Sequence, residues 1–364
     1  MSQKTTQLKV MIMAGGTGGH VFPGIAIAEA LYQQQVNVVW LGTQGGMEKE
    51  WVEKAGLPFH AISIKGLRGN GLLGWLKAPV NVTRAWWQAR KIMRAERPDL
   101  VLGMGGFVCG PGGLAAKTLG IPLVIHEQNA IPGLTNKLLA PLAREVICAF
   151  PQTVLQGNNV VTLGNPVRAG LEDVALLQPQ TGCHVLVLGG SRGALALNET
   201  VPKALALLPP EQRPSVTHQT GVKTLQQAQQ AYAQAGVAAE VVAFIDDMRS
   251  AYEKADMVVS RAGALTVSEL MATARPAIMV PYPQAVDDHQ TANAQALVTL
   301  GGGEVIQQSD LTPQRLAAAL GGWCADPQRR VAASHRIRQG APKDVTGEIA
   351  ARLLALMPSK QCEQ

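Results

Sequence analysis

A glycine-rich segment near the N-terminus ends in a histidine. Gly15-Gly16-Thr17-Gly18-Gly19-His20 follows directly on the apolar run Val10–Ala14. Glycines allow a ligand to approach the backbone closely, and the amide groups at the start of a following helix can bind anionic or polar atoms. His20 is the candidate general base, because an imidazole can accept a proton near neutral pH. The alternative is a histidine that only caps the loop through a hydrogen bond, and the spacing favours neither role.

The glycine-rich segment departs from two common nucleotide-binding motifs. A dinucleotide fingerprint requires a further glycine after Gly16-Thr17-Gly18, where this chain has Val21, and an acid at the end of the second strand, where it has Leu41-Gly42-Thr43. A nicotinamide cofactor, and with it an oxidoreductase, is therefore disfavoured. The chain also has no Gly-x-x-x-x-Gly-Lys-Ser/Thr sequence, which argues against a P-loop ATPase.

The second half of the chain repeats this arrangement. Gly189–Ala194 follows another aliphatic strand and would present Ser191 together with backbone amides at a helix start. Ser260–Thr266 joins a buried strand to a predicted helix, Val267–Thr273, whose positive end can hold a diphosphate. Glu269, one turn into that helix, is suited to bind ribose hydroxyls. By itself it is more simply an acid stabilised by the helix dipole, but next to this turn we favour a ligand contact.

Two polar segments of the second half precede predicted helices. Asp246 or Asp247 is expected to cap one of these helices. Asp287–Ala294 opens the other, where His289 and Gln290 could bind sugar hydroxyls or simply be solvated. No metal site is expected, because the chain has no Asp-x-Asp and its histidines are not paired at ligand spacing. Helix N-termini, a serine and an arginine would then stabilise a leaving diphosphate.

Short apolar strands alternate with helical stretches along the chain, which is typical of parallel sheets covered by helices. The pattern restarts near residue 181, so we predict two Rossmann-like, doubly wound α/β domains facing across a cleft, with ligands beyond the carboxyl ends of the strands. The strands predicted in the first half are Lys9–Met13, Val38–Leu41, His60–Ile64, Leu100–Leu102, Leu123–Ile125 and Val146–Cys148. Those predicted in the second half are Val185–Leu188, Val216–Gln219, Glu240–Ala243, Met257–Val259 and Ala277–Val280.

The length and composition agree with two domains. A chain of 364 residues is too long for one ordinary core. We expect an N-terminal domain over residues 1–165, a C-terminal domain over 166–340, and a final helix and tail over 341–364 that pack back toward the N-terminal domain. Scattered cysteines without a Cys-x-x-Cys pair indicate reduced thiols in a cytosolic protein. A polar N-terminus without a signal peptide, and no apolar stretch of about 18 residues, indicate a soluble or surface-bound protein.

Taken together, the motifs resemble the MurG family. These bacterial enzymes transfer N-acetylglucosamine from its UDP donor to the C4 hydroxyl of undecaprenyl-diphosphate-linked muramyl-pentapeptide, a step of peptidoglycan precursor synthesis. The resemblance extends from about Leu8 to about Leu354. It rests on Gly15–His20 with Pro23, Gly103–Phe107, His126–Asn129, Gly164–Arg168, Gly189–Ala194, Arg261–Glu269 and Asp288–Ala294.

The resemblance implies a GT-B architecture and an inverting, metal-independent reaction without a cofactor. It implies His20 as the base that deprotonates the acceptor, and acceptor-diphosphate contacts at Gly16, Gly105 and Gly106. The family's donor contacts carry over to Thr17, Gly18, Gly19, Asn129, Arg168, Ser191, Ile245 (backbone), Ala264, Leu265, Thr266, Val267, Ser268, Glu269 and Gln290. The expected partners are UDP-N-acetylglucosamine, the lipid-linked acceptor, an anionic membrane surface and other cell-wall synthesis proteins.

Three positions depart from the family pattern. The family usually has Gln at the position of Arg192, and often Tyr and Ser at those of Phe107 and Cys109. Two other functions remain open. One is a UDP-N-acetylglucosamine epimerase of the same fold, and the other is a non-catalytic membrane-surface module that binds nucleotide sugar.

Basic residues are concentrated in one part of the chain. Residues 65–97 contain eight lysines and arginines and one acid, Glu96. We predict a helix over Asn81–Ala95, preceded by an apolar, loop-like segment, Leu72–Lys77. The face predicted to pack inward consists of Val82, Ala85, Trp86, Ala89, Ile92 and Met93. The expected membrane contacts are Leu73, Trp75, Lys77, Arg84, Trp87, Lys91 and Arg94.

A tryptophan among cations on an outer helix face favours contact with an anionic membrane leaflet. Each basic residue near such a surface contributes about 1 kcal/mol, and apolar side chains add shallow insertion. The alternative is a basic face that is merely solvated. Nucleic acid is not expected as a partner, because no recognised fold or aromatic platform accompanies the charges. With the family resemblance, this predicts a peripheral protein on the cytoplasmic face of the bacterial inner membrane.

Overall fold

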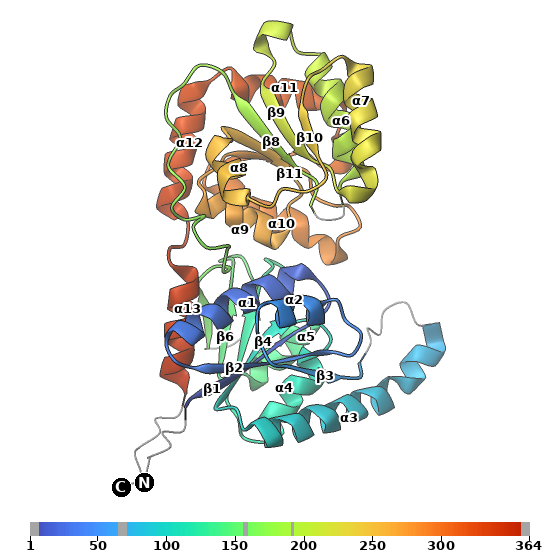
Figure 1. The fold of residues 1–364 in the computed structure, drawn as a ribbon, viewed down its shortest axis with the longest axis vertical. Coiled ribbons are helices and arrows are strands. Elements are labelled where there is room, and N and C mark those ends of the chain that lie inside the picture. The colour runs from blue at the N-terminus through green and yellow to red at the C-terminus, as the bar shows by residue number, and fades with distance from the viewer. Residues whose placement is uncertain (1–6, 65–70, 156–158, 191–192, 358–364) are drawn as a thin grey trace. The chain divides into compact units, whose positions relative to one another are not determined.

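The structure is a computed structural model that describes residues 7–64, 71–155, 159–190 and 193–357, the side chains of 71–78 and 286 excepted. It divides into two compact units. The N-terminal unit consists of residues 1–167 and 344–364, and the C-terminal unit of residues 168–343. The second unit is thus inserted before the last helix of the first (Figure 1).

Parallel strands form the sheet of the N-terminal unit. Within its described part there are seven, in the order β3-β2-β1-β4-β5-β6-β7. The strands are β1 (Lys9–Ala14), β2 (Asn37–Thr43), β3 (Phe59–Ile62), β4 (Leu100–Gly105), β5 (Leu123–Glu127), β6 (Glu145–Cys148) and β7 (Val160–Thr162). The helices are α1 (Gly18–Gln33), α2 (Glu48–Lys54), α3 (Gly71–Glu96), α4 (Cys109–Thr118), α5 (Leu134–Leu139), the 3-10 turn η1 (Ala140–Leu142) and α13 (Val345–Leu356).

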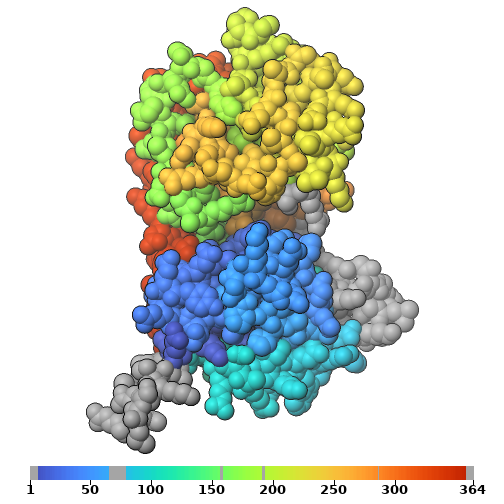
Figure 2. All heavy atoms as spheres, in the orientation of Figure 1, coloured from blue at the N-terminus to red at the C-terminus, as the bar shows by residue number. Residues whose placement is uncertain are grey.

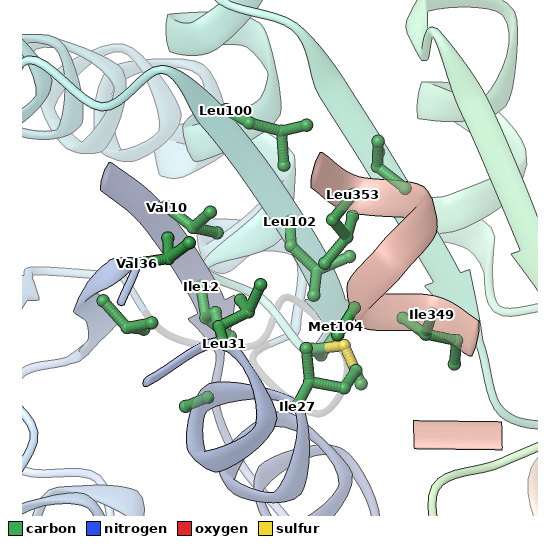
Figure 3. Packing of buried hydrophobic residues seen from close by; sticks show 14 of the residues in the cluster. Val10, Ile12, Ile27, Leu31, Val36, Leu100, Leu102, Met104, Ile349 and Leu353 are labelled. Carbon is green, nitrogen blue, oxygen red and sulfur yellow. The ribbon is translucent and has the colours of Figure 1, made fainter. Parts of the chain in front are cut away.

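Both faces of this sheet are buried, which explains why its strands are continuously apolar. Alternate residues of a strand point to opposite faces. Val10 and Ile12 of β1 pack with α1, α2 and α13 on one face, whereas Met11 and Met13 pack with α3, α4 and α5 on the other. Ile349 of α13 lies in the first of these clusters (Figure 3).

The C-terminal unit repeats the same strand order. In the part of it that the structure describes, six parallel strands run β10-β9-β8-β11-β12-β13. They are β8 (His184–Leu188), β9 (Ser215–Gln219), β10 (Glu240–Val242), β11 (Met257–Ser260), β12 (Ala277–Met279) and β13 (Gly303–Val305). The helices are α6 (Leu195–Ala206), α7 (Leu225–Ala235), α8 (Met248–Lys254), α9 (Ala264–Ala272), α10 (His289–Thr299), α11 (Pro313–Cys324) and α12 (Pro327–Gly340). Short 3-10 turns are η2 (Pro210–Gln212), η3 (Val222–Thr224), η4 (Val286–Asp288) and η5 (Gln308–Asp310).

The predicted strands are all present, and two further strands were not predicted. β7 and β13 are three residues long and lie at sheet edges, where a short segment carries little periodicity. The prediction of a loop at Leu72–Lys77 is wrong, because these residues belong to α3. Leucine is a good helix former, and the one glycine within the segment, Gly74, costs only about 1 kcal/mol.

No helix in the described ranges is both long and apolar enough to cross a membrane.

The last helix completes the core of the N-terminal unit. Ile349 and Leu353 of α13 are fully buried in the cluster that also contains Ile27 and Leu31 of α1 (Figure 3). Arg352 of α13 forms an ion pair with the carboxylate of Glu145 on β6. The helix is therefore held by apolar contacts and by one charged contact.

Truncating a buried side chain of α13 should destabilise the N-terminal unit. Ile349→Ala is expected to lower the free energy of unfolding by about 2–5 kcal/mol, because it leaves a cavity in the cluster. Urea unfolding can be followed by tryptophan fluorescence, to which Trp40 of the same cluster contributes. Glu348→Ala, at the exposed neighbouring position, is the control and should cost less than about 1 kcal/mol. Equal effects of the two changes would contradict this packing.

Candidate active site

Two glycine-rich loops meet where the strand order of the N-terminal sheet reverses. β1 and β4 are neighbours there, and a doubly wound sheet binds ligands at this switch point. Gly15 and Gly16 follow β1, while Gly106 follows β4. A Cβ at Gly106 would lie 2.2 Å from the carbonyl oxygen of Gly15. The φ of Gly106, +86°, also favours glycine. The loops can therefore approach this closely only with glycine at 106.

His20 lies beside this contact. It belongs to the first turn of α1, which begins at Gly18, so the glycine-rich loop is shorter than the sequence motif. A Cβ at Gly105 would lie 2.7 Å from Nδ1 of His20, so the imidazole rests directly on the backbone of Gly105. On the same nitrogen, His20 forms a hydrogen bond of 3.0 Å with Oε1 of Gln128. Neither contact involves Nε2 of the ring.

Gln128 and His126 form a buried hydrogen-bond network behind His20. His126 belongs to β5 and Gln128 follows directly after it, and both are almost completely inaccessible to solvent. Nε2 of Gln128 lies 2.6 Å from the carbonyl oxygen of Met104 and 3.1 Å from Nδ1 of His126. Nε2 of His126 lies 3.0 Å from the carbonyl oxygen of Gly164. Burial lowers the pKa of His126 to about 4, so this imidazole is neutral near pH 7.

The amide of Gly16 points into the protein. It donates to Oε2 of Glu48 at 3.4 Å, and the fully buried Glu48 carboxylate also accepts from the amide and hydroxyl of Thr43. In this structure the Gly16 amide is thus not directed at a ligand. The predicted contact of Gly16 with an acceptor diphosphate would require the loop to rearrange.

Asn129 is held by a buried carboxylate. Oε1 of Glu127 accepts from the backbone amide of Asn129 at 3.0 Å, while Oε2 accepts from Gly133 N at 3.1 Å and from Asn136 Nδ2 at 2.8 Å. These bonds fix the loop after β5. Asn129 therefore lies in a defined position at the carboxyl end of the sheet.

The C-terminal sheet has its own switch point, between β8 and β11. Gly189 and Gly190 follow β8, and Arg261 to Gly263 follow β11. Ser191 and Arg192, which the sequence places in the first of these loops, lie outside the described residues. The second loop leads into α9, which starts at Ala264, three residues earlier than predicted.

The first turn of α9 presents backbone amides rather than side chains. Gly263 is the N-cap, and residues 264–266 are the first of the helix, whose amides have no partner within it. The amide of Val267 already donates to the carbonyl of Gly263 at 3.0 Å. The side chains of Val267 and Ser268 are buried, and the Ser268 hydroxyl donates at 2.9 Å to the first helical carbonyl. Anion binding here would therefore come from residues 264–266.

Glu269 is paired within the C-terminal unit. Its Oε1 lies 3.4 Å from Nε of Arg168, and its Oε2 accepts from the Tyr252 hydroxyl at 3.1 Å. Burial is the main cause that raises the pKa of Glu269, while Arg168 and Tyr252 lower it. The structure thus brings together Arg168 and Glu269, two of the predicted donor contacts.

Gln290 links the loops after β11 and β12. Its Oε1 accepts from the backbone amides of Ala262, at 3.2 Å, and Tyr282, at 2.9 Å. The amide nitrogen of Gln290 is then the group that it can offer to a sugar hydroxyl. Earlier in this unit, Asp247 accepts from the amide of Ser250 and caps α8, as predicted.

The described part of α3 has two distinct faces. Ala85, Ala89 and Met93 are buried, whereas Trp87 keeps 57% of its surface exposed. The exposed residues of the helix include the cations Arg84, Lys91 and Arg94, together with Val80, Asn81, Thr83 and Ala95. The cyan segment that contains this helix lies at the surface of its unit (Figure 2). Leu73, Trp75 and Lys77 lie within the helix, but their side chains are outside the described set.

Comparison with known proteins identifies the family. The glycosyltransferase family 28 N-terminal domain matches residues 10–148, and its C-terminal domain matches residues 184–345. A UDP-N-acetylglucosamine--N-acetylmuramyl-(pentapeptide) pyrophosphoryl-undecaprenol N-acetylglucosamine transferase of Hydrogenovibrio crunogenus is 66% identical over 351 residues, 96% of this chain and 99% of that relative. The transferase of the same name from Hahella chejuensis is 51% identical over 96% of this chain and 97% of its own. The crystal structure of MurG from Acinetobacter baumannii matches with a TM-score of 0.83 and 38% identity, covering 96% of this chain and all of that one.

The chain belongs to the MurG family. It is a glycosyltransferase with the GT-B fold of two parallel-sheet α/β domains. A putative UDP-N-acetylglucosamine 2-epimerase from Listeria monocytogenes also matches, with a TM-score of 0.67 but only 14% identity, so it shares the fold alone.

Cys109 holds the loop after β4 in this MurG-family chain. Its buried Sγ lies 3.3 Å from the carbonyl of Met13 and 3.1 Å from that of Gly105, whose amide in turn donates to the sulfur at 3.2 Å. Burial raises the pKa of the Cys109 thiol to about 12, so the group remains protonated. The thiol thus links the loop to β1.

Several residues that organise the site were not singled out from the sequence. Gln128 and Glu127 lie in a motif from which only Asn129 was selected, and their importance follows from burial rather than from spacing. Glu48 and Tyr252 lie outside every motif, and no sequence pattern could have selected them. Their partners, Gly16 and Glu269, are more than 15 residues away along the chain.

Placing a side chain between the two loops should destabilise the protein. Gly106→Ala is expected to lower the free energy of unfolding by about 1–3 kcal/mol more than the strain of a positive φ alone would, because the new Cβ meets the backbone of Gly15. The control is Gly120→Ala, where φ is +71° but no atom lies within 4 Å of the added Cβ. Thermal unfolding of both variants measures the difference. Equal losses would mean that the loop contact is not a constraint.

Proposed function

We propose that this protein transfers N-acetylglucosamine from UDP-N-acetylglucosamine to the muramyl C4 hydroxyl of undecaprenyl-diphosphate-linked muramyl-pentapeptide. The transfer inverts the anomeric carbon and needs no metal ion. The proposal rests above all on the 66% identity, over nearly full length, to a relative named for this reaction. The product is a precursor of peptidoglycan, on which bacterial cell shape and division depend.

His20 is the proposed base on the acceptor side. Nδ1 of the ring is hydrogen-bonded to Gln128, which leaves Nε2 to take the proton from the hydroxyl of the acceptor substrate. The loops of Gly105 and Gly106 adjoin it and are the proposed cradle of the acceptor diphosphate. The N-terminal unit is therefore assigned to the acceptor.

The C-terminal unit is assigned to the donor. Amides at the start of α9 would stabilise the diphosphate as it leaves, and each such donor is worth around 3 kcal/mol in acyl-transfer enzymes. Glu269, fixed by Arg168 and Tyr252, is placed to bind the ribose. Gln290 would bind the sugar through its amide nitrogen, and Ile245 the uracil through its backbone. The oxygen of the acceptor then forms a bond to the anomeric carbon as UDP departs with the electron pair.

Purified protein should transfer radiolabelled N-acetylglucosamine to a lipid-linked muramyl-pentapeptide without added metal. His20→Ala should lower kcat by about 10²–10⁴-fold, because the acceptor loses its base. His335→Ala, an exposed histidine of α12, is the control and should keep the full rate. UDP release without acceptor would instead support the epimerase, and nucleotide-sugar binding without turnover would support the non-catalytic module. A His20→Ala enzyme of unchanged rate would exclude this base while leaving the transfer in place.

The outer face of α3 is the proposed membrane contact. It combines the exposed Trp87 with Arg84, Lys91 and Arg94, a composition that suits an anionic leaflet. A lipid-linked acceptor resides in a membrane, so the enzyme must work at its surface. We assign the protein to the cytoplasmic face of the bacterial inner membrane, where it would meet other cell-wall synthesis proteins.

Charge reversal on α3 should weaken binding to anionic vesicles. The Arg84→Glu/Lys91→Glu/Arg94→Glu protein is expected to lose at least about 100-fold in affinity, since each cation contributes about 1 kcal/mol. Sedimentation with phosphatidylglycerol-containing liposomes measures this. The matched control reverses three exposed lysines of the C-terminal unit, Lys203, Lys223 and Lys254, with the same change of net charge. Equal binding by the two triple variants would rule out the α3 surface.

A further inference from the structure

A chain of hydrogen bonds determines which nitrogen of His126 carries the proton. Nε2 of His126 faces the carbonyl oxygen of Gly164 at 3.0 Å, and a carbonyl can only accept. Nε2 therefore carries a hydrogen. Because the buried ring is neutral, it has no second hydrogen, and Nδ1 must be an acceptor.

The side-chain amide of Gln128 is oriented by the same reasoning. Its Nε2 lies 2.6 Å from the carbonyl oxygen of Met104 and 3.1 Å from the acceptor nitrogen of His126. Both neighbours are acceptors, so the NH2 end must face them, and its two hydrogens satisfy both. The opposite orientation would place two oxygens 2.6 Å apart without a hydrogen between them. Oε1 of Gln128 is thereby directed at His20.

The last bond of the chain selects the tautomer of His20. Oε1 of Gln128 can only accept, so the hydrogen bond of 3.0 Å requires a proton on Nδ1 of His20. In the neutral ring, Nε2 then carries the lone pair. Gly105, whose missing side chain leaves room for the imidazole, keeps the ring against the backbone.

We propose that Gln128 is a positioning residue that holds His20 in the tautomer with a basic Nε2. The inference rests on the proposed function and adds to it the device that prepares the base. The backbone carbonyls of Met104 and Gly164 determine the direction of every hydrogen bond in this series. Gln128 connects them to His20. During transfer the hydroxyl proton moves to Nε2 while the acceptor oxygen bonds to the anomeric carbon and UDP leaves. The Nδ1–H bond to Gln128 persists throughout, so no proton passes along the chain.

The state of His20 can be observed without catalysis. Ring ¹⁵N chemical shifts of the full-length, ¹⁵N-histidine-labelled protein report the tautomer, and the signals that vanish in His20→Asn are those of His20. At about pH 8, where an ordinary imidazole is neutral, the wild type should show a protonated Nδ1. Gln128→Met should lose this preference, because a thioether is a weak acceptor. Gln128→Glu should keep it, because one carboxyl oxygen still accepts from Nδ1 while the other, which faces the acceptors of Met104 and His126, carries the proton.

The value of kcat should depend on the tautomer of His20. Gln128→Met is expected to lower kcat tenfold or more with little change in KM for UDP-N-acetylglucosamine, and Gln128→Glu to restore part of the loss. The matched control is Gln88→Met, which removes a glutamine oxygen that accepts from the backbone amide of Ser63 at 2.8 Å, away from His20. This variant should retain the wild-type rate and the wild-type His20 spectrum.

Two results would overturn the inference. One is a wild-type His20 with its proton on Nε2, and the other is a Gln128→Met protein whose tautomer and kcat are unchanged. If Gln128→Met does not fold, judged by circular dichroism, the wild-type spectrum and the Gln128→Glu protein still decide. A wild type that shows the expected tautomer but no acceptor-dependent transfer would instead contradict the proposed function.

Discussion

The close contact between the loops after β1 and β4 is the constraint on which the N-terminal site depends. Gly106 approaches the carbonyl of Gly15 more closely than any side chain would allow. The neighbouring Gly105 provides the surface on which His20 rests. The buried thiol of Cys109 contacts the carbonyl groups of Gly105 and of Met13 on β1, and so connects this loop to β1. A ligand at this end of the sheet therefore meets a backbone whose position is determined before it binds.

Several polar side chains that contact none of the proposed ligands hold in place the residues that do. Glu127 fixes the loop of Asn129, and Gln128 fixes the ring of His20. In the other unit, the buried hydroxyl of Tyr252 likewise holds the carboxylate of Glu269. In each case hydrogen bonding offsets the cost of burying the polar group. The proposed catalytic geometry is thus supported by a layer of internal bonds in both units.

The doubly wound fold was predictable because its strands are apolar on both faces and nearly every predicted strand is followed by a turn and a helix. The motifs could also be placed, since β1, β4, β8 and β11 end at the two switch points. The short edge strands β7 and β13 were not predictable, because three residues are too few to show an alternation of apolar and polar side chains. The start of α3 was not predictable either, because its glycine-containing segment shows no clear helical periodicity. The orientation of an amide such as that of Gly16 depends on a distant carboxylate, Glu48, which no local pattern reveals.

The position of α13 has a consequence for synthesis. The N-terminal unit needs Ile349 and Leu353 to close its core, yet a ribosome makes these residues only after the entire C-terminal unit. Until then the apolar side of α1, including Ile27 and Leu31, has no cover from this helix. The unit that is translated first is therefore finished last. During translation its exposed side is a surface that a chaperone would have to protect.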